Sequence, residues 1–162
     1  MQYSTFAAID IGSYDVILEI FEISKKQGIR SVDKICHRME LGKDTYTLGK
    51  IRPEMEEELC RVLADFVRIM EGYRVDAYRA MASSAISEAA NSLYVLGKIR
   101  QLTGLSVTVL SNSEQRFLGY KALAAMELMQ KNRIPFGVSI CYTSKNYRVV
   151  TSDEFLDLLI SK

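Results

Sequence analysis

FAAIDIGSYDVILEIFEI, residues 6–23, is the stretch that decides the fold. Apolar residues run up to Asp10 and resume after Tyr14, which is typical of two strands joined by a tight turn that holds Gly12 and Ser13. A third strand-like run, IRSVDKICHRMEL, follows a second turn with the sequence KQG. We therefore predict an antiparallel meander over about the first 40 residues.

A loop and then a helix are predicted after the meander. The stretch GKDTYTLGK, residues 42–50, is rich in Gly and Lys and is interpreted as the loop. Pro53 and the glutamates that follow it are a strong helix start, and Gly72 ends the element. Apolar residues recur at helical spacing between these limits: Met55, Leu59, Val62, Leu63, Phe66 and Met70.

Two further pairs of strand and helix complete the pattern. The run VDAYRAMA leads to Ser83 and Ser84, candidate caps of a helix that Gly104 ends. The run LSVTVL leads to a third helix, for which Ser111 and Glu114 form a capping box. The second helix has an expected buried stripe of Ile86, Ala89, Ala90, Leu93, Leu96 and Ile99.

The order of these elements predicts the fold class. The third helix is expected to run to about Lys131. A meander followed by strand, helix, strand and helix implies a mixed five-stranded sheet with crossover helices. The fold class is therefore α/β, and residues 1–162 are expected to form a single domain.

Composition excludes several classes of function. The chain has 162 residues, 48% hydrophobic and 25% charged, and 21 basic against 20 acidic side chains give a net charge of +1. Such a balance predicts neither nucleic acid nor a membrane surface as a general partner. With no apolar stretch approaching the roughly 20 residues that span a bilayer, we expect a soluble, cytoplasmic protein.

The metal-ligating residue types do not form a recognisable site. Cys36, Cys60 and Cys141 are far apart and odd in number, which fits neither a disulfide framework nor a zinc site. They are expected to be reduced and mostly buried thiols. His37, the one histidine, lies in a predicted strand without a partner at metal spacing.

Four stretches of the chain resemble the exopolyphosphatase and guanosine pentaphosphate phosphohydrolase family. They are FAAIDIGS, YRAMASSAISEAAN, SVTVLSNSEQRFLGY and the acidic helix that begins at Pro53, and together they cover about residues 6–130. The resemblance implies a ribonuclease H-like domain of the actin and hexokinase type. Residues 1–132 would correspond to the first domain of the family, and residues 133–162 to a degenerate hairpin and short helix in place of a second domain.

The resemblance also implies roles for individual residues. Backbone N–H groups and hydroxyls of the first turn hold phosphate oxygens, a neighbouring Asp helps to place Mg²⁺, and a residue at the start of the third helix activates water. The substrates would be polyphosphate or guanosine polyphosphates. The corresponding positions are Gly12, Ser13, Ser83 and Ser84 for phosphate, Asp10 for the metal, and Glu114 and Gln115 for catalysis.

The chain departs from the family pattern at the positions that matter most. Tyr14 and Asp15 replace the family's Asn-Ser, which puts a ring and a like charge at the phosphate turn. The two arginine positions are Ile17 and Ser87. The position of the catalytic glutamate is Gln115, whose amide does not take a proton from water near neutral pH.

Each of these residues also has an ordinary structural interpretation. Asp10 and Gly12 suit a hairpin turn, and Glu114 suits a capping box. Ser83, Ser84 and Ser87 suit a helix cap and first turn, and Tyr14 suits packing over the turn. In the last 30 residues, the runs FGVSICY and NYRVVT predict a hairpin whose turn contains Lys145, a weak attractor for an anion.

Two functions from different classes remain. In the first, the domain lacks full catalytic activity and serves as an anion-binding or protein-interaction module. In the second, it is a divergent Mg²⁺-dependent phosphohydrolase that uses Asp10 and Glu114, completed by a second chain. Since an isolated first domain exposes the face that packs against its partner domain, we also expect a homo-oligomer or a second-domain partner chain.

Overall fold

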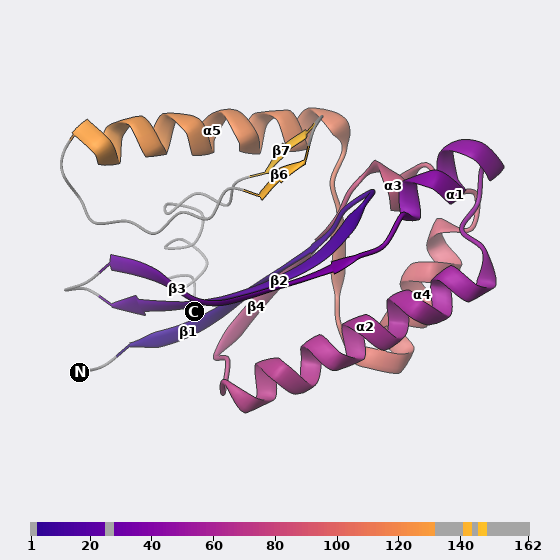
Figure 1. Cartoon of the computed structure of the whole chain (residues 1–162), viewed down its shortest axis with the longest axis horizontal. Coiled ribbons are helices and arrows are strands. Elements are labelled where there is room, and N and C mark those ends of the chain that lie inside the picture. The colour runs from indigo at the N-terminus through magenta and orange to yellow at the C-terminus, as the bar shows by residue number, and fades with distance from the viewer. Residues whose placement is uncertain (1–2, 25–27, 132–140, 144–145, 149–162) are drawn as a thin grey trace.

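A mixed five-stranded sheet in the order β3-β2-β1-β4-β5 forms the centre of the computed structural model (Figure 1). The structure describes residues 3–24, 28–131, 141–143 and 146–148, with side chains as far as residue 121. Strands β1, β2 and β3 pair antiparallel, whereas β4 is parallel to β1 and β5 is parallel to β4. The predicted meander and the α/β class are confirmed. The strands are β1 (Ser4–Ile11), β2 (Asp15–Ser24), β3 (Gly28–Arg38), β4 (Ala77–Ala82) and β5 (Val107–Val109).

Helices lie on both sides of this sheet. Figure 1 shows α2 and α4 on one side and α5 on the other, with the short α1 and α3 beyond the strand ends. The long α2 begins at Pro53 and ends at Gly72, as the sequence predicts. The helices are α1 (Leu41–Leu48), α2 (Pro53–Gly72), α3 (Ser84–Ser87), α4 (Ser92–Thr103) and α5 (Asn112–Lys131).

The main core lies between the sheet and the α2 and α4 layer. Alternate residues of β1 face this core because successive side chains of a strand point to opposite faces. Asp10, between two of them, therefore points to the opposite side of the sheet, where α5 lies. Core residues from the strands and both helices include Ile9, Ile11, Leu18, Leu59, Leu63 and Ile99.

The segment predicted as a loop at residues 42–50 is mostly helix α1. Thr45 Oγ1 donates to the Ala85 carbonyl oxygen at 2.6 Å, and the Gly42 N–H donates to the Ser13 carbonyl oxygen at 2.8 Å. Gly49 ends the helix in the left-handed conformation with φ of 71°. The prediction was wrong because contacts with residues far away in the sequence stabilise this helix. A polar segment of eight residues has no local pattern that indicates such contacts.

The second predicted helix is divided into α3 and α4, and its expected buried stripe is correct only in part. The Ala90 N–H donates to the Gly49 carbonyl oxygen at 2.8 Å, and this contact holds the chain between the two helices away from helical geometry. The break rotates α4, so that Leu93 is 86% exposed and Val95 is buried instead. Of the remaining expected stripe, Ile86, Ala89 and Ile99 are buried, Ala90 is exposed and Leu96 is half-buried.

The C-terminal hairpin is described only in part. Strands β6 (Cys141–Thr143) and β7 (Asn146–Arg148) pair antiparallel, within the runs predicted to form this hairpin. Lys145 and the expected short helix lie outside the described residues. None of the helices that the structure describes is long and apolar enough to cross a membrane.

The cysteines are only partly as expected. Cys60 is buried in the core, and burial raises the pKa of its thiol. Cys36 is exposed, contrary to the expectation of mostly buried thiols, and lies on β3, an edge strand of the sheet. The side chain of Cys141 lies outside the described residues.

Candidate functional site

The candidate residues lie at one end of the sheet, where the parallel strands have their carboxyl ends. In the parallel strands β1, β4 and β5, Ile11 is opposite Ala82, and Ala82 is opposite Val109. The segments that leave these three carboxyl ends therefore start side by side, which is where ligands bind in open α/β sheets. They carry Gly12 and Ser13, then Ser83 and Ser84, then Glu114 and Gln115.

The β1–β2 turn is a closed hairpin tied to its neighbours. The Gly12 N–H donates to the Asp15 carbonyl oxygen at 2.9 Å, so this amide is used within the turn. The Tyr14 carbonyl oxygen accepts from the Met39 N–H at 2.8 Å. The Tyr14 side chain is half exposed. These bonds fix the backbone of the turn and engage the Gly12 N–H and the Tyr14 carbonyl oxygen.

Three hydroxyl groups meet beside this turn. The Tyr46 hydroxyl, on α1, lies 2.7 Å from Ser84 Oγ and 3.4 Å from Ser13 Oγ. We refer to Ser13, Tyr46 and Ser84 as the hydroxyl cluster. The structure thus brings together Ser13 and Ser84, two of the residues predicted to bind phosphate. Sequence reasoning missed Tyr46 because it lies in the segment interpreted as a loop, and no local pattern relates it to the serines.

The two serines of the β4–α3 connection have different roles. The Ser83 N–H and hydroxyl both donate to the Ile11 carbonyl oxygen, at 3.0 and 3.2 Å. Ser83 and Ser84 were predicted to cap a helix, but neither side chain caps α3. The Ser83 hydroxyl bonds β1 instead, and the Ser84 hydroxyl bonds Tyr46. Ser83 therefore joins two strands, whereas Ser84 belongs to the hydroxyl cluster.

Asp10 lies opposite an apolar residue of the neighbouring strand. Its partner across the antiparallel pair is Ile17, which shares the same face and is only 5% exposed. The position that the resemblance aligns with the first arginine therefore carries a buried apolar side chain. The second, Ser87, is exposed at the end of α3. Within the described residues there is no cluster of three or more His, Cys, Asp or Glu side chains that could hold a metal ion.

The start of α5 contains the predicted capping box. The Ser111 N–H donates to Glu114 Oε2 at 2.7 Å, and the Glu114 N–H donates to Ser111 Oγ at 3.2 Å. Hydrogen bonding to the side chain and then the backbone of Ser111 holds the pKa of Glu114 below its ordinary value. A general base works best with a pKa near the operating pH, so this shift makes Glu114 a poorer proton acceptor.

Gln115 is part of the packed structure. Its side chain is 5% exposed, and Nε2 donates to the Leu110 carbonyl oxygen at 3.3 Å. The Leu110 N–H in turn donates to the Ala82 carbonyl oxygen at 3.0 Å. The Gln115 amide thus connects the start of α5 to the end of the sheet. This structural role requires the N–H donor of the amide.

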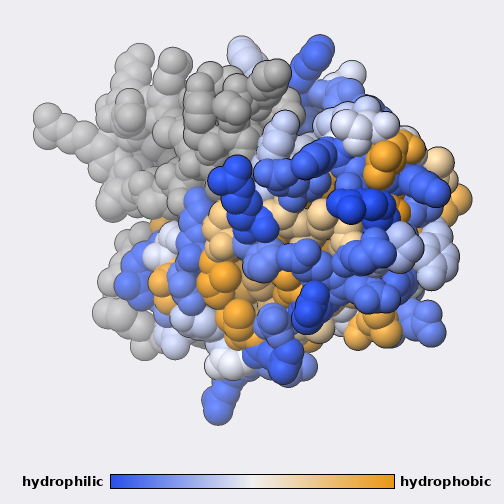
Figure 2. Space-filling model, turned by 45° about the vertical axis from the view of Figure 1, so that its right-hand side comes forward, coloured by the Kyte–Doolittle hydropathy of each residue, from blue (hydrophilic) through white to orange (hydrophobic). Residues whose placement is uncertain are grey.

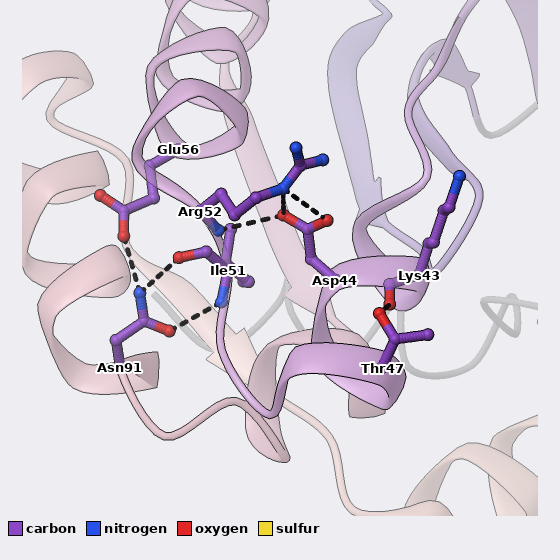
Figure 3. Close-up of polar contacts among 7 residues, drawn as sticks. All are labelled: Lys43, Asp44, Thr47, Ile51, Arg52, Glu56 and Asn91. Carbon is purple, nitrogen blue, oxygen red and sulfur yellow. Dashed lines mark hydrogen bonds and ion pairs between the residues drawn. The ribbon is translucent and has the colours of Figure 1, made fainter.

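A polar network behind the site holds α1 in place (Figure 3). Asp44, which is buried, accepts from Arg52 Nε at 2.9 Å and from the Arg52 N–H at 3.0 Å. Burial opposes ionisation of Asp44, but the hydrogen bonds and charge of Arg52 outweigh it and lower the pKa of this carboxyl. Asn91 bonds both the N–H and the carbonyl oxygen of Ile51. The helix that carries Tyr46 is therefore anchored at its C-terminal side.

Gly42 allows α1 to approach the turn, and Gly42→Ala tests this contact. An added Cβ would lie 2.9 Å from Ser13 Cβ and 3.0 Å from a ring carbon of Tyr46. We expect the free energy of unfolding to fall by about 1–2 kcal/mol, as in other overpacked sites. Urea denaturation followed by circular dichroism measures it. Gly97→Ala is the control because its Cβ would meet open space within α4, and equal stability of the two variants would contradict the close approach.

On the face seen in Figure 2, hydrophilic residues surround groups of hydrophobic ones. Large exposed apolar side chains occur on more than one element. They include Leu93, Tyr94 and Leu102 on α4 and Phe117 and Tyr120 on α5. Because these residues are spread over separate helices, their exposure alone does not identify a partner.

Comparison with known proteins gives a consistent result. A model of the Ppx/GppA phosphatase family matches residues 19–135. Exopolyphosphatase 1 of Mycobacterium leprae is 25% identical over 115 residues, which are 71% of this chain and 34% of the relative. The chain therefore spans about a third of the length of this curated relative.

Solved structures agree with the family model. The crystal structure of the Aquifex aeolicus member of the Ppx/GppA family is 25% identical, with a TM-score of 0.70 over 86% of this chain and 43% of that one. An exopolyphosphatase from Cytophaga hutchinsonii is 21% identical, with a TM-score of 0.70 over 74% of this chain and 38% of that one. The second likeness shows the fold alone. In both comparisons the chain spans less than half of the solved protein.

Proposed function

Because the chain belongs to the Ppx/GppA phosphatase family, we propose that it is an exopolyphosphatase-related domain that binds phosphate oxyanions beside the β1–β2 turn without full catalytic activity. The observation that carries this proposal is Gln115. Its buried amide bonds the Leu110 carbonyl oxygen, at the position where the family resemblance implies the catalytic carboxylate. A domain with this amide lacks the proton acceptor of the reaction and uses the position for a structural contact.

The charge-stabilising groups support the same conclusion. Phosphoryl transfer depends mainly on positioning and on neutralisation of charge, and one arginine contributes about 10³–10⁵ in rate in nucleotide hydrolases. Ile17 and Ser87 occupy both arginine positions of the family pattern. The neighbouring Glu114 is engaged by Ser111, with a lowered pKa. The loss of a base and two cations favours binding without turnover.

The groups available for binding are neutral donors and one carboxylate. Ser13 and Ser84 supply hydroxyl groups close to the hairpin turn. Asp10 fits Mg²⁺ only as a single-carboxylate ligand, and Mg²⁺ is commonly held by one or two carboxylates together with the phosphates of the substrate. When bound, Mg²⁺ would neutralise charge on the anion. Weak binding that improves with Mg²⁺ is the expected behaviour.

A divergent phosphohydrolase is the second candidate. The specific observation in its favour is that Glu114 is exposed and lies at the same end of the sheet as Asp10. In this alternative the two carboxylates act with Mg²⁺ on polyphosphate or guanosine polyphosphates, and a second chain completes the site. Self-association and a second-domain partner chain stay predictions, as does location in the cytoplasm.

The proposal is tested by titration with medium-chain polyphosphate and with guanosine tetraphosphate, each with Mg²⁺. Calorimetry measures binding, and a colorimetric assay measures released phosphate. We expect binding of at least one anion without release, and weaker binding by Ser84→Ala. Release that disappears in Glu114→Gln would support the phosphohydrolase instead. If neither the wild type nor variants without the Tyr46 hydroxyl bound either anion, the anion-binding function would be overturned.

A further inference from the structure

The hydroxyl of Tyr46 lies where an oxygen of a bound anion would be expected. A phosphate oxygen that accepts from a serine hydroxyl lies about 2.5–3.0 Å from it. The Tyr46 oxygen is 2.7 Å from Ser84 Oγ and also contacts Ser13 Oγ at 3.4 Å. Whichever atom donates in these contacts, the phenol oxygen already takes up a hydrogen-bonding position at both serine hydroxyls. An anion that is to use this position must displace the phenol.

Tyr46 is held in this position by its helix but is not part of the core. Contacts of Thr45 with Ala85 and of Asp44 with Arg52 fix the backbone of α1. The Tyr46 side chain itself is 53% exposed. Its ring can therefore rotate toward solvent without opening the buried core. A fixed helix with a movable side chain is the arrangement that a gate requires.

Ser84 gives the phenol contact a specific consequence. Its side chain is on a residue only 7% exposed, so water has limited access to it. Because a buried hydroxyl needs a hydrogen-bond partner, the Tyr46 hydroxyl satisfies Ser84 in the anion-free protein. An anion that replaces the phenol must provide this partner again. The two therefore compete for the same buried group.

We propose that Tyr46 is a gate residue whose hydroxyl closes the anion site and competes with phosphate oxygens for Ser13 and Ser84. This inference rests on the proposed anion-binding function. It adds a determinant of affinity that the family resemblance does not include. The ligand class is a phosphate oxyanion small enough to place one oxygen between the two serines once the phenol rotates away.

The gate is tested by comparing wild type, Tyr46→Phe and Tyr94→Phe in calorimetric titrations with pyrophosphate and Mg²⁺. Tyr46→Phe keeps the ring and removes the competing hydroxyl, so we expect its Kd to be about 2- to 10-fold lower, the effect of one net hydrogen bond. Tyr94, also mostly exposed, lies on α4 with its ring 6.0 Å from Lys98 Nζ, outside the hydroxyl cluster. Its variant should bind as wild type does. Tyr46→Ala provides a second variant that opens the site completely.

The outcomes separate the gate from the function on which it rests. Binding by Tyr46→Phe alone, or tighter binding than by wild type, supports both. Binding by wild type with equal or weaker binding by Tyr46→Phe overturns the gate and leaves the anion-binding function standing. If wild type, Tyr46→Phe and Tyr46→Ala all fail to bind, the anion-binding function is wrong, and the gate is overturned with it.

Discussion

Asn91→Ala is expected to lower the free energy of unfolding by about 3 kcal/mol. Asn91 Oδ1 accepts from the Ile51 N–H at 3.0 Å, and Nδ2 donates to the Ile51 carbonyl oxygen at 2.8 Å and to Glu56 Oε1 at 2.7 Å (Figure 3). Ile51 and Glu56 are both buried. Each lost hydrogen bond contributes about 1 kcal/mol, and buried groups left without partners add to this.

Urea denaturation followed by circular dichroism measures the effect. Asn112→Ala is the matched control because Asn112 is exposed at the start of α5, and its loss should change stability by about 0.5 kcal/mol or less. Asn91→Asp keeps the acceptor for Ile51 but turns the donor toward Glu56 into a second carboxylate oxygen. It should be no more stable than Asn91→Ala near neutral pH. A loss below about 1 kcal/mol in Asn91→Ala would show that the network is dispensable.

Gln115→Glu is expected to lower stability by about 3 kcal/mol at neutral pH without restoring phosphate release. The substitution places a carboxylate at a 5% exposed position, facing the Leu110 carbonyl oxygen that now accepts from Nε2. The carbonyl loses its donor, and the new charge is buried without a cation. Because Ile17 and Ser87 are unchanged, a transferring phosphoryl group would still lack arginine side chains at these two positions.

The pH dependence gives this prediction a definite sign. Burial raises the pKa of the introduced carboxyl in the folded state above its unfolded value. Its destabilising effect is therefore small at acid pH, where both states hold the proton, and grows as pH rises past the unfolded pKa. Denaturation at several pH values compares Gln115→Glu with Gln101→Glu, an exposed position on α4. A pH-independent difference, or phosphate release by Gln115→Glu, would contradict the account of Gln115.

Elements with a strong local pattern were predictable from the sequence. The hairpin around Gly12, the helix that begins at Pro53 and the capping box of Ser111 and Glu114 are all found where they were expected. In each case the signal is contained in a short window, since turn residues, a first-turn proline and a cap act on their immediate neighbours. The family resemblance likewise depends on short stretches in a fixed order.

Elements that depend on distant contacts were not predictable in the same way. Helix α1 and the break before α4 oppose the local pattern, because the contacts of Thr45 with Ala85 and of Asn91 with Ile51 join residues 40 positions apart. Intrinsic helix propensity contributes little to the stability of a helix compared with such tertiary contacts. The exposure of Leu93, which was expected to be buried, is a direct consequence, since moving a helix start changes which face is buried.

The sequence by itself determined the α/β class and the order of the strands along the chain. Only the tertiary structure decided that Tyr46 lies against Ser13 and Ser84, over separations of 33 and 38 residues. The physical reason is that local pattern selects helix, strand and turn, whereas a site forms where separate segments meet at the carboxyl ends of parallel strands.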